Sequence, residues 1–490
     1  MNSRRNFCLG VPLALVLQLS KFQIALLALA VALGAAGAQA QTVTIKSIRD
    51  LGTMTGDPIN PQWVGLIAQG RDGNMYTTTP KGLASGSVGT AFKITPTGKL
   101  TVLHNFASAE GTPLSGLVLG TDGNFWGTTY NGGHSGCANN QGCGQVFKMT
   151  PTGKLSFYPF MGGNDGGNPV APPIEASNGI FYGTTEFGGI SSDGTIYQIT
   201  ESGVLTPIFP FGASNGDQPT GALLQATNGL LYGTTDGSSC GDNCSEATIF
   251  SITTGETFQE VYAFPNFWGP LYNGLVQAYD GDLWGTIAGG GAKSCGQIFK
   301  ITTKGVESDE HDFNCSSDGA NPVAGLLLAT GGDLCGVTQN GGQDLLGEFF
   351  CITEEGKFTP YAPFTSINGA HPTVTPFQHT NGIIYGDANQ GGETTNTGTF
   401  YKVTGLKFEK PFVSLVLNAG KVGSTVEILG QGFVKGKTTV SFNGGSPINA
   451  TVTSATYLTA IVPPKATTGF VTVTTPTAKL TSNRKFQVLK

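Results

Sequence analysis

Charged side chains are scarce in this sequence: Asp, Glu, Lys and Arg make up only 12% of its 490 residues, and the formal net charge is −6. The body of the chain contains no run of Lys or Arg. Nucleic-acid binding depends on clustered positive charge that neutralises phosphate groups. We therefore expect no nucleic-acid partner, and nothing in the charge pattern indicates binding to a membrane surface.

Recognisable catalytic and cofactor motifs are absent as well. The sequence has no GxSxG nucleophile elbow, no HExxH motif, no P-loop and no dinucleotide-binding fingerprint before a helix. It also lacks the paired CxxC spacing of zinc sites and the contiguous Asp-x-Asp-x-Asp-Gly loop of EF-hand calcium sites. These absences predict no motif-defined catalytic residue, no metal and no cofactor, and they favour a non-enzymatic protein.

Glycine, by contrast, is abundant, with 74 positions. Many glycines stand in Asp-Gly or Asn-Gly pairs between short apolar runs, a pattern typical of short strands joined by tight turns. The composition therefore predicts an all-β protein and not an array of helices.

The first 40 residues predict an export signal. Arg4 and Arg5 precede an apolar stretch from residue 22 to residue 36, and Ala38-Gln39-Ala40 has the small residues of a cleavage site. Cleavage there makes residues 1–40 a signal peptide and starts the mature chain at Gln41. A membrane anchor is the alternative, but the apolar stretch is shorter than the about 20 residues of a membrane span.

The export route stays open, because Ser3-Arg4-Arg5-Asn6-Phe7 resembles a twin-arginine signal while the general secretory route also fits. Either route predicts a secreted, periplasmic or cell-surface protein with no membrane span after cleavage. Removal of the signal also removes Cys8 and leaves eight of the nine cysteines. An even number of cysteines is consistent with disulfides in an oxidising compartment.

A pattern with a period of about 50 residues recurs along the chain, within the range of propeller repeats. Each copy has a Gly followed three positions later by an aromatic residue, which Cys335 replaces in one copy, and usually then by Gly-Thr-Thr. The seven copies are marked by Gly73 with Tyr76, Gly123 with Trp126, Gly179 with Tyr182, Gly229 with Tyr232, Gly281 with Trp284, Gly332 with Cys335, and Gly382 with Tyr385.

Each copy contains four strand-like segments, which predict one four-stranded propeller blade. In the second copy the turns are Asp122-Gly123 and Pro151-Thr152-Gly153, on either side of the strand-like residues 145–149. Several strands are apolar on both faces, so we expect the repeated aromatics, Trp126 and Trp284 included, to pack between blades. Ligand contact is the alternative role for these aromatics.

The two ends of the repeat region are incomplete in complementary ways. After the seventh marker the sequence supplies a third strand at residues 398–404 and no fourth strand. Residues 42–51, at the mature N-terminus, look like a fourth strand without its own blade. Pairing of these two segments predicts a closed ring without exposed sheet edges, whereas an open solenoid would need capping ends. The fold class is therefore a seven-bladed β-propeller, spanning residues 41–406 and closed by an N-terminal strand.

The repeats resemble the GloVer (Gloeo/Verruco) tandem-repeat family. The resemblance rests on Leu231-Tyr232-Gly233-Thr234-Thr235, Gly132-Gly133, Val146-Phe147-Lys148 and Asp318-Gly319-Ala320-Asn321-Pro322, and it covers about residues 43–404. It implies an exported protein with a propeller fold and an exchangeable C-terminal module, and it implies no particular reaction. Departures such as Thr77 and Asp387 are local.

Residues 407–490 form a separate module in which the repeat period ends and Val, Thr and Lys become frequent. The stretch is similar to the IPT/TIG immunoglobulin-like fold, through Val426-Glu427-Ile428-Leu429-Gly430-Gln431-Gly432-Phe433, Val440-Ser441-Phe442 and Ile461-Val462-Pro463-Pro464. The resemblance implies a β-sandwich that serves as a spacer or an interaction domain.

The eight remaining cysteines predict four disulfides. Two would each staple a long loop, one would join the start of a third strand to the end of the adjacent fourth, and one would join paired strands of the sixth blade. The predicted pairs are Cys137–Cys143, Cys240–Cys244, Cys295–Cys315 and Cys335–Cys351. Zinc ligation is the competing interpretation.

The longer loops of the repeats fall on one rim of the predicted ring, as between strands two and three at residues 131–144 and between strands four and one at residues 161–169. Binding residues are expected on such loops. The candidates on this rim are His134, Asn164, Asp165, Asp217, Phe267, Trp268, Asp318 and His371. Phe267-Trp268 could stack on a sugar ring, or could instead fill the core of blade five.

Three functions are consistent with this sequence. The first is an exported, monomeric, non-enzymatic protein that binds a glycan or a protein partner on the long-loop rim. The second is a polysaccharide-active hydrolase or lyase that uses carboxylates from several blades, such as Asp165, Asp217 and Asp318. The third is a cell-surface spacer.

Overall fold

Strands make up nearly all of the regular structure of this protein. The computed structural model describes residues 42–62, 65–137, 141–212, 214–237, 246–265, 271 and 273–490. The predicted signal peptide, Cys240, Cys244, Phe267 and Trp268 lie outside these residues. Within them there is no α-helix, and Gly163–Asp165 forms the 3-10 turn η2. No helix in this part of the chain is long and apolar enough to cross a membrane.

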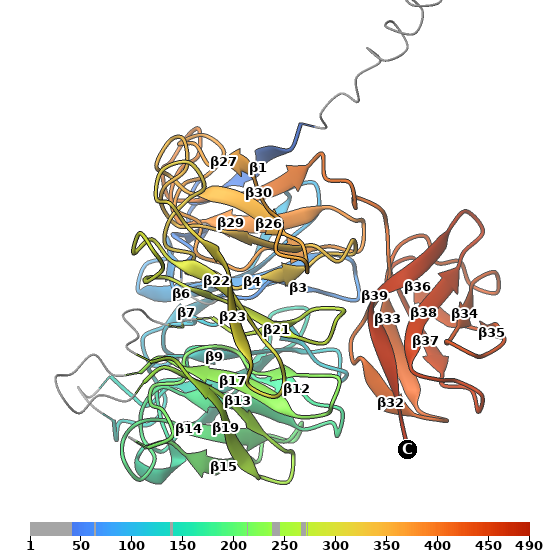
Figure 1. Ribbon diagram of the computed structural model, residues 1–490, viewed down its shortest axis with the longest axis horizontal. Coiled ribbons are helices and arrows are strands. Elements are labelled where there is room, and N and C mark those ends of the chain that lie inside the picture. Colours follow the sequence, from blue (N-terminus) through green and yellow to red (C-terminus); the bar gives the residue numbers. More distant parts are fainter. Residues whose placement is uncertain are drawn as a thin grey trace, which may run out of the picture. The chain divides into compact units, whose positions relative to one another are not determined.

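Residues 44–404 form seven four-stranded antiparallel sheets, one for each copy of the repeat (Figure 1). A separate two-stranded sheet pairs β2 (Pro58–Ile59), which precedes the first of these sheets, with β5 (Lys81–Gly82), which falls between its second and third strands. The first sheet contains β3 (Ala68–Gln69), β4 (Met75–Thr79), β6 (Ser87–Ile94) and β7 (Leu100–Ala107). The second contains β8 (Val118–Leu119), β9 (Phe125–Thr129), β10 (Gln145–Met149) and β11 (Leu155–Pro159). The third contains β12 (Ile174–Glu175), β13 (Phe181–Thr185), β14 (Thr195–Ile199) and β15 (Leu205–Pro210).

The remaining four sheets repeat the same order of strands. The fourth contains β16 (Leu224–Gln225), β17 (Leu231–Thr235), β18 (Thr248–Ile252) and β19 (Phe258–Ala263). The fifth contains β20 (Val276–Gln277), β21 (Leu283–Ile287), β22 (Gln297–Ile301) and β23 (Glu307–Asp312). The sixth contains β24 (Leu327–Leu328), β25 (Leu334–Val337), β26 (Glu348–Ile352) and β27 (Phe358–Pro363). The seventh combines β28 (Phe377–Gln378), β29 (Ile384–Ala388) and β30 (Thr399–Thr404) with β1 (Thr44–Asp50) from the N-terminus.

The pairing predicted for the N-terminal segment is confirmed. Strand β1 pairs antiparallel with β30, from Thr44 opposite Thr404 to Asp50 opposite Thr399. In Figure 1 the blue strand β1 lies beside the orange strand β30. The outer edge of the seventh sheet is therefore built from the start of the repeat region, as the complementary ends of the sequence required.

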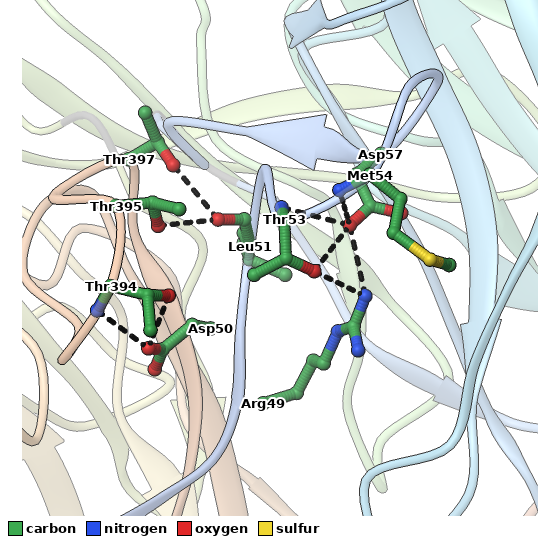
Figure 2. A network of polar contacts seen from close by, with 9 residues as sticks. All are labelled: Arg49, Asp50, Leu51, Thr53, Met54, Asp57, Thr394, Thr395 and Thr397. Carbon is green, nitrogen blue, oxygen red and sulfur yellow. Dashed lines mark hydrogen bonds and ion pairs between the residues drawn. The ribbon is translucent and has the colours of Figure 1, made fainter.

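A polar network fixes the chain just after β1 (Figure 2). The Leu51 carbonyl oxygen accepts hydrogen bonds from the hydroxyls of Thr395 (2.7 Å) and Thr397 (2.8 Å), in the loop before β30. Asp57 is 3% exposed, and its Oδ2 accepts hydrogen bonds from the Thr53 and Met54 amides, both at 3.0 Å. The same oxygen lies 2.9 Å from Arg49 Nη2. This network ties the chain after β1 to the loop before β30 and orders the segment that leads to the first sheet.

Neighbouring sheets are joined by a glutamine that recurs at the end of the first strand. Gln225 Oε1 accepts from the Ser177 amide of the preceding sheet at 2.8 Å, and Gln277 Oε1 accepts from the Thr227 amide at 2.8 Å. Gln69 of the first sheet makes the same contact with the seventh sheet. The first and seventh sheets are therefore neighbours in the same sense as sheets that follow each other in sequence.

Aromatic rings fill the space between neighbouring sheets. The Trp126 ring is fully buried and stacks on Phe181 of the third sheet, with 4.3 Å between ring centroids. Tyr76 stacks in the same way on Phe125 of the second sheet, at 4.0 Å. Trp284 is also fully buried. The prediction that the repeated aromatics pack between sheets is confirmed.

Three of the four predicted disulfides are present. Cys137–Cys143, Cys295–Cys315 and Cys335–Cys351 are bonded, with Cα–Cα distances of 5.0, 5.4 and 4.0 Å. Cys335 and Cys351 stand directly opposite each other on β25 and β26. The pair Cys240–Cys244 falls outside the described residues. Three disulfides are consistent with a non-cytoplasmic protein.

Residues 414–489 form two further sheets that share one hydrophobic core. The four-stranded sheet contains β31 (Ser414–Leu415), β33 (Thr425–Leu429), β37 (Tyr457–Ile461) and β36 (Thr451–Ser454). The five-stranded sheet contains β32 (Ala419–Lys421), β39 (Lys479–Leu489), β38 (Gly469–Thr474), β34 (Thr439–Ser441) and β35 (Ile448–Asn449).

This C-terminal segment contacts the turns between the first and second strands of the repeat sheets. Arg71 Nη2 lies 2.8 and 2.7 Å from the two carboxylate oxygens of Glu427. The Arg71 guanidinium also lies over the Tyr457 ring, 4.7 Å from its centroid. The Tyr279 hydroxyl donates a hydrogen bond of 2.7 Å to the Asn483 carbonyl oxygen.

Candidate functional site

One variable residue follows the second strand of each repeat sheet, directly or after one further residue. In three of the seven sheets it comes directly after Gly-Thr-Thr, and in the others it follows a related stretch. The seven residues are Pro80, Tyr130, Glu186, Asp236, Ala288, Gln339 and Asn389. Their chemistry differs from sheet to sheet, while the backbone that carries them repeats.

The backbone at these positions is held by the loop that enters the next sheet. In that loop a residue with positive φ precedes a proline, as at Asn60 (φ 46°), Asn168 (φ 56°) and Asn321 (φ 55°). Asn168 Nδ2 donates to the Tyr130 carbonyl oxygen at 2.8 Å, and Asn60 Nδ2 donates to the Asn389 carbonyl oxygen at 3.0 Å. The second of these contacts joins the first sheet to the seventh. Asparagine suits this position because it tolerates the left-handed conformation and carries an amide donor.

These junctions surround a central cavity of about 570 Å³. The cavity draws its walls from residues spread over most of the repeat region, which indicates that it lies where the sheets converge. Its described lining residues are Gln62, Leu114, Tyr130, Val170, Glu186, Thr220, Val323, Gln339, Thr373 and Asn389. A cavity of this size is within the range of small-molecule sites in proteins.

Two hydroxyl groups in the cavity wall have no partner. Thr220 is 5% exposed and Thr373 is 6% exposed, and both residues line the cavity. Within the described part of the chain, neither Oγ1 atom makes a hydrogen bond. Buried polar groups in proteins are nearly always hydrogen-bonded, because desolvation without a partner is costly. Both oxygens are buried within the wall, so a molecule in the cavity reaches them only if these side chains rotate.

Carboxyl groups from adjacent sheets give this region its electrostatic character. Burial raises the pKa of Glu186, which lines the cavity, and a hydrogen bond from the Tyr130 hydroxyl opposes that shift. Burial also raises the pKa of Asp236, to about 7, and repulsion from Glu186 and Asp217 adds to the increase. The Leu271 amide, which donates to Asp236 Oδ1 at 2.8 Å, partly offsets it. Near neutral pH these two carboxyls hold a proton more readily than exposed ones.

Among the described residues, the candidates predicted in the long loops lie outside the cavity lining. His134 is exposed, and its Nδ1 accepts a 3.2 Å hydrogen bond from the Gly136 amide in its own loop. Asn164 and Asp165 lie in the turn η2, where Asn164 is exposed. Asp217 is 5% exposed with no hydrogen bond to Oδ1 among the described residues, and it reaches the site only through its electrostatic effect on Asp236.

Asp318 and His371 support the loops. The Asp318 carboxylate accepts from the Asn314 amide at 2.9 Å and lies 3.1 Å from His311 Nε2. Arg49 with Asp57 and His104 with Glu110 make the same kind of contact in other sheets. His371 Nδ1 lies 3.0 Å from the Gln339 carbonyl oxygen, so it frames the cavity wall without lining it.

Sequence reasoning missed the residues that line the cavity. Glu186, Gln339 and Asn389 line the cavity and were not predicted, because the prediction was based on acids and aromatics in the longest loops. Asp236, whose pKa is affected by Glu186, was not predicted either. A signal was nevertheless present. The position after Gly-Thr-Thr varies in chemistry inside an otherwise repeated motif, as expected when one fold position is reserved for specificity.

The Gloeobacter/Verrucomicrobia repeat matches residues 60–271 and 246–446, which together exceed half of the chain. The chain belongs to this repeat family. Membership agrees with the family resemblance seen in the sequence, and the match by itself defines no ligand. No curated protein is significantly similar in sequence.

Several solved structures are similar to this chain at low sequence identity. One is the extracellular domain of a putative hybrid two-component system from B. thetaiotaomicron, with 11% identity, a TM-score of 0.47, and coverage of 90% of this chain and 57% of that chain. Another is a periplasmic gluconolactonase from Pseudomonas aeruginosa, with 11% identity, a TM-score of 0.40, and coverage of 67% and 99%. A third is a putative gluconolactonase, with 11% identity, a TM-score of 0.37, and coverage of 74% and 97%. Similarity at this level assigns no ligand or reaction to the chain.

Proposed function

We propose that the seven repeat sheets are the blades of a closed β-propeller spanning residues 41–406, and that residues 407–490 are an IPT/TIG immunoglobulin-like sandwich. The ring is supported by two contacts that join the first and seventh sheets, Gln69 with Thr380 and Asn60 with Asn389. The sandwich is supported by two sheets around a shared core. Residues 1–40 are the signal peptide of an exported, monomeric protein in this proposal.

The function that the geometry supports best is non-enzymatic binding of a hydroxyl-rich ligand, such as a glycan, in the central cavity. The main support for this function is the pair of buried hydroxyls of Thr220 and Thr373 in the cavity wall, which have no hydrogen-bond partner among the described residues. Gln339 and Asn389 add amide groups that both donate and accept hydrogen bonds. A ligand with many hydroxyls offers both donors and acceptors to these groups, and a cavity of 570 Å³ has the size of a small-molecule site. The glycan is therefore favoured over the protein partner.

A glycan array with the full mature protein tests this function, followed by calorimetry on the ligands found. Replacement of the cavity hydroxyls in Thr220→Val and Thr373→Val is expected to weaken binding about threefold to tenfold each, the value of one or more lost hydrogen bonds. Thr184→Val is the matched control, because Thr184 Oγ1 is also buried without a partner among the described residues but does not line the cavity. Absence of any glycan ligand, or equal weakening by all three variants, would contradict the proposal.

A polysaccharide-active hydrolase or lyase is the second candidate function. It is favoured by Asp236, whose pKa of about 7 suits a carboxyl that donates a proton near neutral pH. Release of reducing sugar from the polysaccharide whose fragment binds best is the measurement. Turnover that disappears in Asp236→Asn, with glycan binding retained, would establish catalysis over simple binding.

A further inference from the structure

We infer that the ligand of the central cavity carries a protonated amine beside its hydroxyl groups, as an amino sugar does, and that Glu186 receives the ammonium group. This inference rests on the proposed binding function and specifies its ligand. It follows from the charges of the wall, the unpartnered hydroxyls, and the contacts of the two neighbouring carboxyls.

The cavity wall contains a carboxylate and no cation. Glu186 lines the cavity, and none of the described lining residues is Lys, Arg or His. Neither Glu186 nor Asp236 forms an ion pair with any described residue. The internal segments outside the described residues, 63–64, 138–140, 213, 238–245, 266–270 and 272, contain no Lys, Arg or His in the sequence. Neither the described residues nor these internal segments therefore supply a cationic partner to the two carboxyls.

The two carboxyls lie in a region of negative charge, since Glu186 and Asp217 both repel the charge of Asp236. Burial raises the pKa of Glu186, and a hydrogen bond from Tyr130 lowers it. Burial, Glu186 and Asp217 raise the pKa of Asp236, and the hydrogen bond from the Leu271 amide lowers it. A carboxylate that loses water without gaining a cation is unfavourable, and an opposite charge within a few ångströms restores much of that free energy. An ammonium group is small enough to approach Glu186 and carries three donors for the surrounding oxygens.

The unpartnered hydroxyls supply independent support for a ligand at this place. Thr220 and Thr373 are more than nine-tenths buried and line the same cavity as Glu186. A simple inorganic cation would satisfy oxygen atoms but would leave the amide donors of Gln339 unused, whereas Asn389 Nδ2 already donates to the Pro61 carbonyl oxygen at 3.0 Å. Among the described residues no group of three or more His, Cys, Asp or Glu side chains could hold a metal ion. A ligand with both an ammonium and several hydroxyls can pair with Glu186 and with the amide of Gln339.

The test compares three β-1,4-linked disaccharides that differ only at the second carbon of each ring, which carries a hydroxyl, an acetamide or an ammonium group. Calorimetry with the full mature protein at pH 7.5 is expected to give at least tenfold tighter binding of the glucosamine disaccharide than of the other two. Raising the salt concentration should reduce this preference, because ions screen the attraction. Glu186→Gln keeps the size of the side chain and should remove the preference, and Asp236→Asn should reduce it.

Glu201→Gln provides the matched control, because Glu201 is exposed in the turn between β14 and β15. It should leave the preference unchanged, and thermal denaturation should show that every variant folds. Equal affinity for the three disaccharides, or a preference that survives Glu186→Gln in a folded protein, would overturn the inference while leaving glycan binding intact. A blank glycan array would instead refute the proposed function, and the inference with it.

Discussion

Gln69 and Thr380 form two hydrogen bonds with each other although 311 residues separate them. Gln69 Nε2 donates to the Thr380 hydroxyl at 2.9 Å, and the Thr380 amide donates to Gln69 Oε1 at 3.0 Å. Both residues are buried, at 4% and 1% exposure. The contact therefore joins the two ends of the repeat region through groups that water does not reach.

Replacement of Gln69 by leucine should destabilise the protein by about 1–3 kcal/mol, because the buried Thr380 amide loses its partner. Leucine fits the position sterically, since Leu119 and Leu328 occupy it in the second and sixth sheets. Chemical denaturation measures the loss. Gln225→Leu, which frees the partly buried Ser177 amide between sheets continuous in sequence, should cost less. An equal or larger effect at Gln225 would contradict this account.

Asp57→Ala should destabilise the protein by about 2–4 kcal/mol, because it leaves two backbone amides and Arg49 without their acceptor. Thermal and chemical denaturation give the value. Glu393→Ala, in the exposed loop that precedes β30, should be nearly neutral. A neutral Asp57→Ala would show that the polar network after β1 contributes little to holding the N-terminal strand.

Removal of the Cys335–Cys351 disulfide should lower stability by about 2–3 kcal/mol, as expected from chain entropy for a short loop. The double variant Cys335→Ala/Cys351→Ala tests this by chemical denaturation. Its unfolding should also respond less to a reducing agent than that of the wild-type protein. If the reductant lowered the stability of both proteins equally, this disulfide would not contribute.

The pH dependence of stability should change in Asp236→Asn. The folded-state pKa of Asp236 is raised to about 7, above that of an unfolded aspartate, so its stabilising contribution is complete below about pH 4. That contribution is lost as the pH rises through 7, because the folded protein must then ionise a buried carboxyl. Asparagine avoids this loss. The stability of the variant relative to wild type should therefore increase between pH 4 and pH 8, and a constant difference would be contrary to this expectation.

The strands and their pairing were predictable because their signals are local and repeated. Asp122-Gly123 marks a turn wherever it occurs, and Gly123 adopts the positive φ of 78° that such a turn requires. The partner of β1 was predictable for a different reason, since the seventh repeat lacked one strand and residues 42–51 could supply it. Cys335 and Cys351 followed from the same alignment, which places them opposite each other.

The site was less predictable because it depends on which side chains from many repeats face one point. Asp318 and Glu186 have the same chemistry in the sequence. In the folded protein His311 and the Asn314 amide occupy the Asp318 carboxylate, while Glu186 faces the cavity. Loop length did not indicate the residues that line the cavity, since long loops such as the one holding His134 bond mainly to themselves.

The ladder between β1 and β30 also sets an order of events during synthesis. Thr44 is made early, yet its partner Thr404 comes 360 residues later. The first strand must wait without a partner until nearly all of the repeats have been translated, and contacts between such distant segments slow folding. A nascent chain that stops before residue 399 would carry a solitary strand at one end and an open sheet edge at the other, and would be prone to aggregate.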